Sequence, residues 1–104
     1  MATVTKAIAR TAAATTSTTL YTVPTTSTIT VVSNIVLSNA ATSASTATIA
    51  FDGVTIVPGV SIPANSVVGF DMKQVIPANA TPKIITGSAS TTAVSIHISG
   101  VEIS

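Results

Sequence analysis

The side chains that could do chemistry are few in this 104-residue chain, and its single histidine, His97, is the first candidate. A histidine can serve as a general base or a metal ligand. A general base needs an oriented partner within hydrogen-bond reach, and the sequence places no nucleophile beside His97. Because His97 lies in the middle of an alternating run, we interpret it as an exposed or interface residue. We predict no catalytic residue and no enzyme activity.

The carboxylates also predict no metal or cofactor site. Asp52 precedes Gly53 and is explained as a turn residue, whereas Asp71 lies two residues from Lys73 and predicts a surface pair. Glu102 is expected to be solvated. Calcium sites use closely spaced loop oxygens, which these positions do not provide. The chain has no cysteine, so no thiolate zinc site is expected.

Charge is unusually scarce, which bears on the partners of the chain. Only 7% of the residues are charged and the net charge is +1, against roughly 25% charged residues in an ordinary domain. A free domain usually keeps its net charge away from zero to avoid association. We infer that other polypeptides cover much of the surface. Four dispersed cations predict no nucleic-acid interface, and no run of about 18 apolar residues predicts a membrane helix.

Composition predicts strands almost everywhere, because the chain contains 20 Thr, 13 Val and 12 Ile. These β-branched residues fit a pleated surface better than a helix. Strands are expected over residues 20–23, 28–38, 46–51, 54–57, 66–75, 82–88 and 93–103. The pattern predicts an all-β fold, an antiparallel β-sandwich (Ig-like or jelly-roll-like) of seven or eight short strands with an N-terminal arm, and a closed barrel is the alternative.

The alternation also predicts which side chains share a face of a strand. Over 28–38, Ile29, Val31, Ile35 and Leu37 share one face, with Ser33 as the exception. The other face is also partly apolar, so cover on both sides of this strand stays open. In the last strand Val94, Ile96 and Ile98 share a face, and the phase then changes after Gly100. A bulge at Ser99-Gly100 would return Val101 and Ile103 to the core.

Turn residues divide the strands. Asp52-Gly53 between alternating runs predicts a type I′ hairpin, and Pro58-Gly59 is expected to end the following strand. The repeated tetrapeptide at Ile62–Asn65 and Ile76–Asn79 predicts two corners. Pro24 and Gly87 are expected to close two further strands.

Residues 1–16 differ from the sandwich domain expected over 17–104, because they are small and poorly patterned. They hold half of the cations, Lys6 and Arg10, which we predict to dock on a partner. A frayed terminus without a role and a short helix over 4–14 are the alternatives.

Three segments resemble a group of small virion proteins of tailed bacteriophages. The segments are Leu20-Tyr21-Thr22-Val23-Pro24, Leu37-Ser38-Asn39 and Ile96-His97-Ile98-Ser99-Gly100-Val101-Glu102. The resemblance implies a capsid decoration or cement protein, made in the bacterial host cytoplasm and placed on the capsid surface of the virion. Its implied partners are the major capsid protein and further copies of itself, with a trimer favoured by capsid symmetry.

Members of such groups also serve in tails and necks, so these locations stay open. A receptor- or glycan-binding sandwich is the second class of function, and a groove containing Tyr21 and His97 would favour it.

Overall fold

Alternating residues form eight strands in the part of the chain that the structure describes. The structure is a computed structural model, and it describes residues 3–23, 29–79, 81 and 83–103. The strands are β1 (Thr3–Ala12), β2 (Thr18–Thr22), β3 (Ile29–Asn39), β4 (Ser45–Phe51), β5 (Val54–Ile62), β6 (Ser66–Pro77), β7 (Ile84–Ala89) and β8 (Val94–Ile103).

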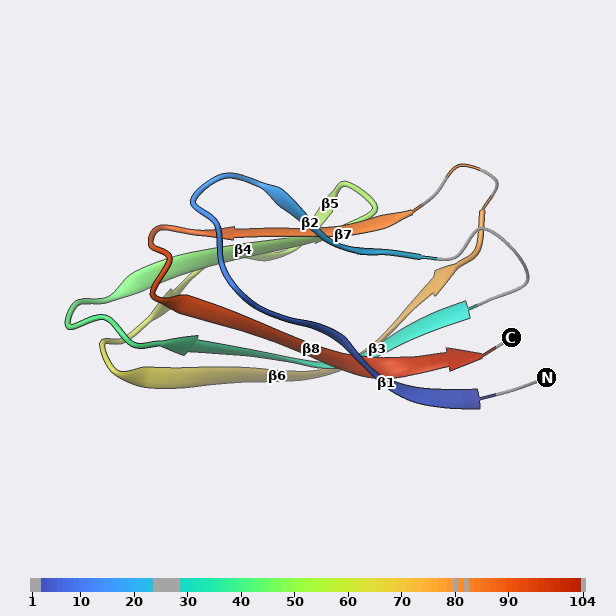
Figure 1. The fold of residues 1–104 in the computed structure, drawn as a ribbon, viewed down its shortest axis with the longest axis horizontal. Coiled ribbons are helices and arrows are strands. Elements are labelled where there is room, and N and C mark those ends of the chain that lie inside the picture. Colours follow the sequence, from blue (N-terminus) through green and yellow to red (C-terminus); the bar gives the residue numbers. More distant parts are fainter. Residues whose placement is uncertain (1–2, 24–28, 80, 82, 104) are drawn as a thin grey trace.

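The strands form two antiparallel four-stranded sheets that lie face to face (Figure 1). One sheet has the order β1-β8-β3-β6 and the other β2-β7-β4-β5. The chain therefore pairs its first strand with its eighth, its second with its seventh, its third with its sixth and its fourth with its fifth. This is a long antiparallel hairpin wrapped into a double sheet, the jelly-roll arrangement. The predicted β-sandwich is confirmed, and the strand order agrees with its jelly-roll form, because an Ig-like sandwich keeps its first two strands in one sheet.

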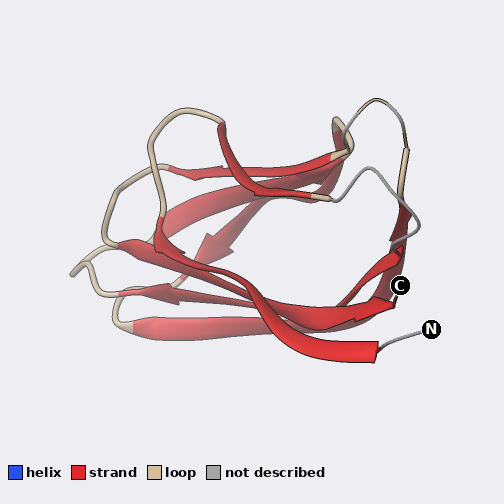
Figure 2. Cartoon of the chain, turned by 45° about the vertical axis from the view of Figure 1, so that its right-hand side comes forward, coloured by secondary structure: helices blue, strands red, loops and turns tan. Residues whose placement is uncertain are grey.

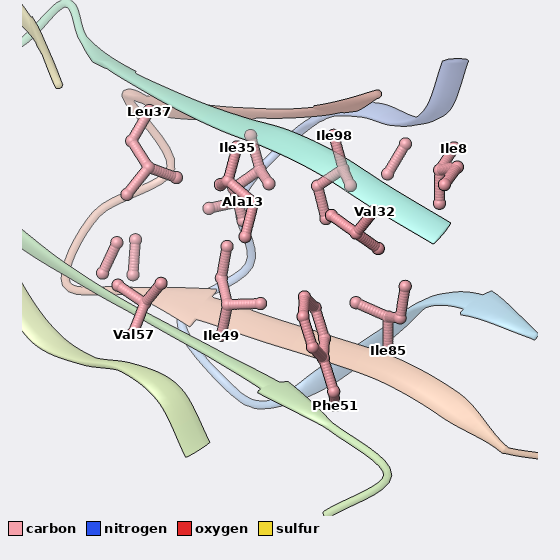
Figure 3. Close-up of a cluster of buried hydrophobic side chains, with 14 of the residues drawn as sticks. Ile8, Ala13, Val32, Ile35, Leu37, Ile49, Phe51, Val57, Ile85 and Ile98 are labelled. Carbon is pink, nitrogen blue, oxygen red and sulfur yellow. The ribbon is translucent and has the colours of Figure 1, made fainter. Parts of the chain in front are cut away.

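Apolar side chains from both sheets fill the space between them. Figure 3 shows Ile35 and Leu37 of β3 pointing toward Ile49 and Val57 of the opposite sheet. All four are buried, as are the predicted core residues Val94, Ile96 and Ile98 of β8. Burial of such side chains is the main force that holds two sheets together.

The first strand replaces the predicted N-terminal arm. Thr3–Ala12 pair with β8 from Ile103 to Ser95, so this segment is an edge strand of the sandwich and not a free arm or a helix. Ile8 and Ala9 are both buried, because the register shifts between Ala7 and Ala9. Two consecutive inward side chains break the alternation, which is why the sequence pattern did not indicate a strand here.

The predicted common face of Ile29, Val31, Ile35 and Leu37 is wrong, because a second register shift occurs at Ser33. The pairing of β3 with β8 passes from Val32 opposite Gly100 to Asn34 opposite Ser99, which leaves Ser33 as an extra residue. The Ser33 hydroxyl donates a hydrogen bond to the Ser99 carbonyl oxygen at 3.1 Å. Such a bulge exchanges the two faces of the strand beyond it. Thr30 and Val32 are therefore buried, and Ile29 is 40% exposed.

The predicted bulge in β8 lies instead in its two neighbours. Gly100 pairs with Lys6 on one side and Val32 on the other, beside the shifts in β1 and β3. A Cβ atom on Gly100 would lie 2.1 Å from the Val31 carbonyl oxygen, so only glycine fits between them. The strand β8 keeps its alternation, and Val101 and Ile103 stay half-buried and outside the core.

The predicted hairpin at Asp52-Gly53 is confirmed, with φ of 53° and 78° at its two residues. Pro58-Gly59 does not end a strand. Both residues lie within β5 at a register shift opposite Thr48, where a proline on an edge strand is tolerated. Asn65, with φ of 52°, forms the predicted corner between β5 and β6.

Gly87 also lies within its strand and not at its end. It is buried in β7, where an added Cβ atom would lie 2.8 Å from Leu20 Cδ1 of β2. The glycine is thus explained by the close approach of a side chain from the neighbouring strand. The predicted role of Pro24 falls outside the described residues.

Candidate interaction surface

A polar cluster joins the two sheets at the end where the chain termini lie (Figure 1). Tyr21 of β2 donates a hydrogen bond to Glu102 Oε2 of β8. Lys6 of β1 donates to Glu102 Oε1 at 3.0 Å and to the Tyr21 hydroxyl oxygen at 3.2 Å. The Thr30 hydroxyl of β3 lies 3.4 Å from Glu102 Oε2. Glu102 was predicted to be solvated, but it is half-buried, and its carboxylate is in contact with side chains from three other strands.

Each charge of this cluster is stabilised by its neighbours. The hydrogen bond from Tyr21, helped by Lys6, holds the pKa of the Glu102 carboxyl below its ordinary value. The hydrogen bonds to Glu102 and Tyr21 raise the pKa of Lys6. Burial raises the pKa of the Tyr21 hydroxyl, and the carboxylate beside it acts in the same direction. At neutral pH the carboxylate and the ammonium are thus charged and paired, so the cluster is suited to holding the sheets together.

The two predicted docking cations have different surroundings. The Lys6 ammonium is held by Glu102 and also lies 5.2 Å from the centre of the Tyr21 ring, so its charge is already paired within the chain. Arg10 is exposed on the outer face of the first sheet, in a row with His97, Val36 and Gly69. A docking role for both residues stays a prediction, and Arg10 has the accessible charge.

An apolar patch covers one end of the same outer face. Two neighbouring rows of the sheet run across β8, β3 and β6, and their side chains point away from the core. The first row is Val101, Val31 and Val75, and the second is Ile103, Ile29 and Pro77. We call these six residues the outer apolar patch. Val75 is 56% exposed, and no part of the second sheet covers this side (Figure 2).

The alternation of the sequence did not predict the outer apolar patch, because the bulge at Ser33 changes the face of the residues before it. Ile29 and Val31 have the parity of Ile35 and Leu37, which are buried, so alternation alone placed all four on one face of the strand. The signal that could have found the patch is Ser33 itself, a polar residue in the middle of an apolar face.

The outer face of the second sheet has a different chemistry. Its central strands β4 and β7 present hydroxyl and methyl groups outward, with Thr48 opposite Ser88 and Ala50 opposite Thr86. These side chains are small, and the hydroxyl groups among them can form hydrogen bonds to water. The two faces of the sandwich are therefore unequal, and the apolar one is the candidate interaction surface.

The remaining charges lie at strand edges and turns. Lys83 donates to Asp52 Oδ2 at 2.6 Å, a pair that the turn interpretation of Asp52 did not include. Asp71 and Lys73 are both exposed on β6, and the predicted ion pair between them is not formed; neither is bonded to another described side chain.

The described residues contain no pocket and no cluster of potential metal ligands. They also contain no helix of the length and apolarity needed to cross a membrane. The groove that would favour glycan binding is not formed, because Tyr21 is bonded to Glu102 whereas His97 lies on the outer face of β8. No family model, curated protein or solved structure matches the chain.

Proposed function

We propose that the chain is a structural virion protein of a tailed bacteriophage, a capsid decoration protein that lies with one sheet face against the outer surface of the head. The outer apolar patch carries this proposal. It is a contiguous set of Val, Ile and Pro side chains on three strands, left outside the core of the single chain. Contiguous apolar surface of this kind marks sites of protein contact.

Composition supports a protein partner over other ligands. The core of a protein interface is depleted in charge, and the outer apolar patch contains no charged side chain. The opposite face, rich in Thr and Ser, suits contact with water. The partners that follow from the proposal are the major capsid protein and other copies of this chain, at the capsid surface of the virion. The jelly-roll arrangement occurs in viral capsid proteins among others, which supports the proposal by analogy of fold alone.

Cosedimentation with purified heads of the phage that encodes the chain, stripped of this protein, tests the proposal. We expect the purified protein to bind these heads to saturation and to protect them against heat. Ile29→Lys places a charge in the outer apolar patch at a 40% exposed position, and we expect it to weaken binding at least tenfold.

Thr86→Lys is the matched control, because it adds the same charge to a central strand of the other outer face. It should bind heads as the unaltered protein does. Equal loss with both variants, or no binding to heads at all, would overturn the proposal. Binding to isolated tails or necks in place of heads would favour the alternative location.

A further inference from the structure

Among the residues that the structure describes, the edge strand β6 has a partner strand on one side only. It ends the order β1-β8-β3-β6, and its other side pairs with β3 over residues 66–71 and 74–77, with Met72 and Lys73 opposite Ser33 at the register shift. An edge strand presents unpaired backbone N–H and C=O groups to any strand that can lie beside it. At 12 residues β6 is the longest strand described, so it offers the longest such edge.

Two opposite charges lie near the middle of this edge. Asp71 and Lys73 are exposed and share the outward parity of Val67, Gly69 and Val75. Neither makes an ion pair within the described chain. Charges on an edge strand often prevent pairing with other chains. Two opposite charges two residues apart, however, can each lie opposite the unlike charge of a second, antiparallel copy of the same strand.

We propose that β6 pairs antiparallel with β6 of a second copy of this chain, with Met72 at the twofold axis. In this register Asp71 lies opposite Lys73 of the second copy, and Lys73 lies opposite its Asp71. Directly opposed unlike charges stabilise a strand pair, whereas like charges destabilise it. The contact is isologous, so both ion pairs form at once and the assembly closes as a dimer.

The side chains next to the charges are also complementary in this register. Gly69 lies opposite Val75 of the second copy, so an exposed valine covers a position without a side chain. An added Cβ at Gly69 meets nothing closer than Val36 Cγ2 at 3.9 Å, so the outward side of Gly69 is open. Val67, 64% exposed in the single chain, lies opposite Pro77 of the second copy.

Other registers are disfavoured by the same charges. A shift of the pairing by two residues in one direction places Lys73 opposite Lys73, and in the other direction Asp71 opposite Asp71. A shift by one residue places outward side chains opposite inward ones. One register therefore satisfies both the charges and the faces, which favours a second copy over an unrelated peptide.

The mass of the protein in solution tests this pairing. Sedimentation velocity over a concentration series should show a dimer, twice the 10.3 kDa chain mass. Asp71→Lys and Lys73→Asp each replace two attractive pairs by two repulsive ones, and each should raise the dissociation constant by roughly tenfold or more. The double variant D71K/K73D restores opposite charges and should form a dimer again.

Mixing the two single variants is the sharpest test. The Asp71→Lys chain has two lysines at these positions and the Lys73→Asp chain has two aspartates, so they should form a heterodimer although each alone is a monomer. Thr55→Lys, which adds a charge at an exposed position of β5, an edge strand of the other sheet, is the control and should leave the dimer intact. Circular dichroism confirms that every variant is folded.

A monomeric or trimeric mass for the unaltered protein would overturn the pairing, as would single variants that dimerise normally. The inference does not rest on the proposed function, because binding to heads is measured separately and depends on the outer apolar patch. A monomer that still binds heads would leave the proposed function standing and remove the dimer.

Discussion

The hydroxyl of Tyr21 donates a hydrogen bond to Glu102 across the gap between the two sheets. The residues are 81 positions apart in the chain, and the contact joins an edge strand of one sheet to a central strand of the other. Lys6 and Thr30 bond to the same carboxylate, so all the strands of the cluster meet at one side chain. This half-buried cluster closes the sandwich where the apolar core ends.

Removal of the Tyr21 hydroxyl should destabilise the fold without changing its packing. We expect Tyr21→Phe to lower the free energy of unfolding by about 1–2 kcal/mol, because a hydrogen bond to a charged group is lost. Urea unfolding followed by circular dichroism measures the change. Thr22→Val, an exposed change on the same strand, is the control and should shift stability by less than about 0.5 kcal/mol. Equal effects of the two variants would show that the contact does not stabilise the fold.

The Glu102 carboxyl should make stability depend on pH in the acid range. Its pKa is lowered in the folded chain, so the unfolded chain binds the proton more tightly. The stabilisation is present above the ordinary carboxyl pKa of about 4.3 and is lost as pH falls through the lowered value. We expect the difference in unfolding free energy between the unaltered protein and Glu102→Gln to shrink over this range. A difference that is constant with pH would contradict the assignment.

Tyr21 should make the stability of the fold depend on pH in the alkaline range. Its pKa is raised by burial, so its contribution is present below the ordinary tyrosine pKa of about 10 and is lost as pH rises through the raised value. Tyr21 is the only tyrosine of the chain, so tyrosinate absorbance reports it alone. The folded protein should titrate at higher pH than the protein in concentrated urea. A titration that is the same in both conditions would refute the burial of this hydroxyl.

Gly100 should be intolerant of any side chain. We expect Gly100→Ala to cost about 3 kcal/mol or more, since its Cβ would meet the Val31 carbonyl oxygen of a central strand, which cannot move freely. Gly69→Ala, on the open edge strand β6, is the control and should be neutral or slightly stabilising. Thermal unfolding of both variants measures the contrast, and similar melting temperatures would exclude the close approach at Gly100.

The hydrogen bonds of Asn39 should stabilise the corner between β5 and β6. Its buried amide donates to the carbonyl oxygens of Ser43, Ile62 and Pro63 and accepts from the Ala41 N–H at 2.9 Å. We expect Asn39→Ala to destabilise the fold by about 3 kcal/mol, because buried backbone groups lose their partners. Urea unfolding measures the cost.

Asn34→Ala provides the comparison for that measurement. Asn34 lies on the same strand but on the outer face, beside Ser99 of β8. We expect its replacement to change the unfolding free energy by less than about 0.5 kcal/mol. Equal costs for the two asparagines would show that the Asn39 hydrogen bonds do not determine the corner.

Predictions from alternation succeeded where a strand keeps one parity along its length. Val94, Ile96 and Ile98 of β8 are buried as expected, and so are Ile35 and Leu37 of β3. They failed where a neighbour imposes a register shift, as at Ser33 and at Ile8. A bulge is decided by two strands together, so neither strand alone contains its full signal.

The sequence by itself determined the fold class, the Asp52-Gly53 hairpin and the shortage of charge, because these depend on composition and on neighbours within a few residues. Only the tertiary structure decided that residues 3–12 are a strand, that Glu102 bonds to Lys6 96 positions away, and that Ile29 and Val31 face outward. The physical reason is that the alternation of side chains is a property of one strand, whereas register and pairing arise between strands that are distant in the chain.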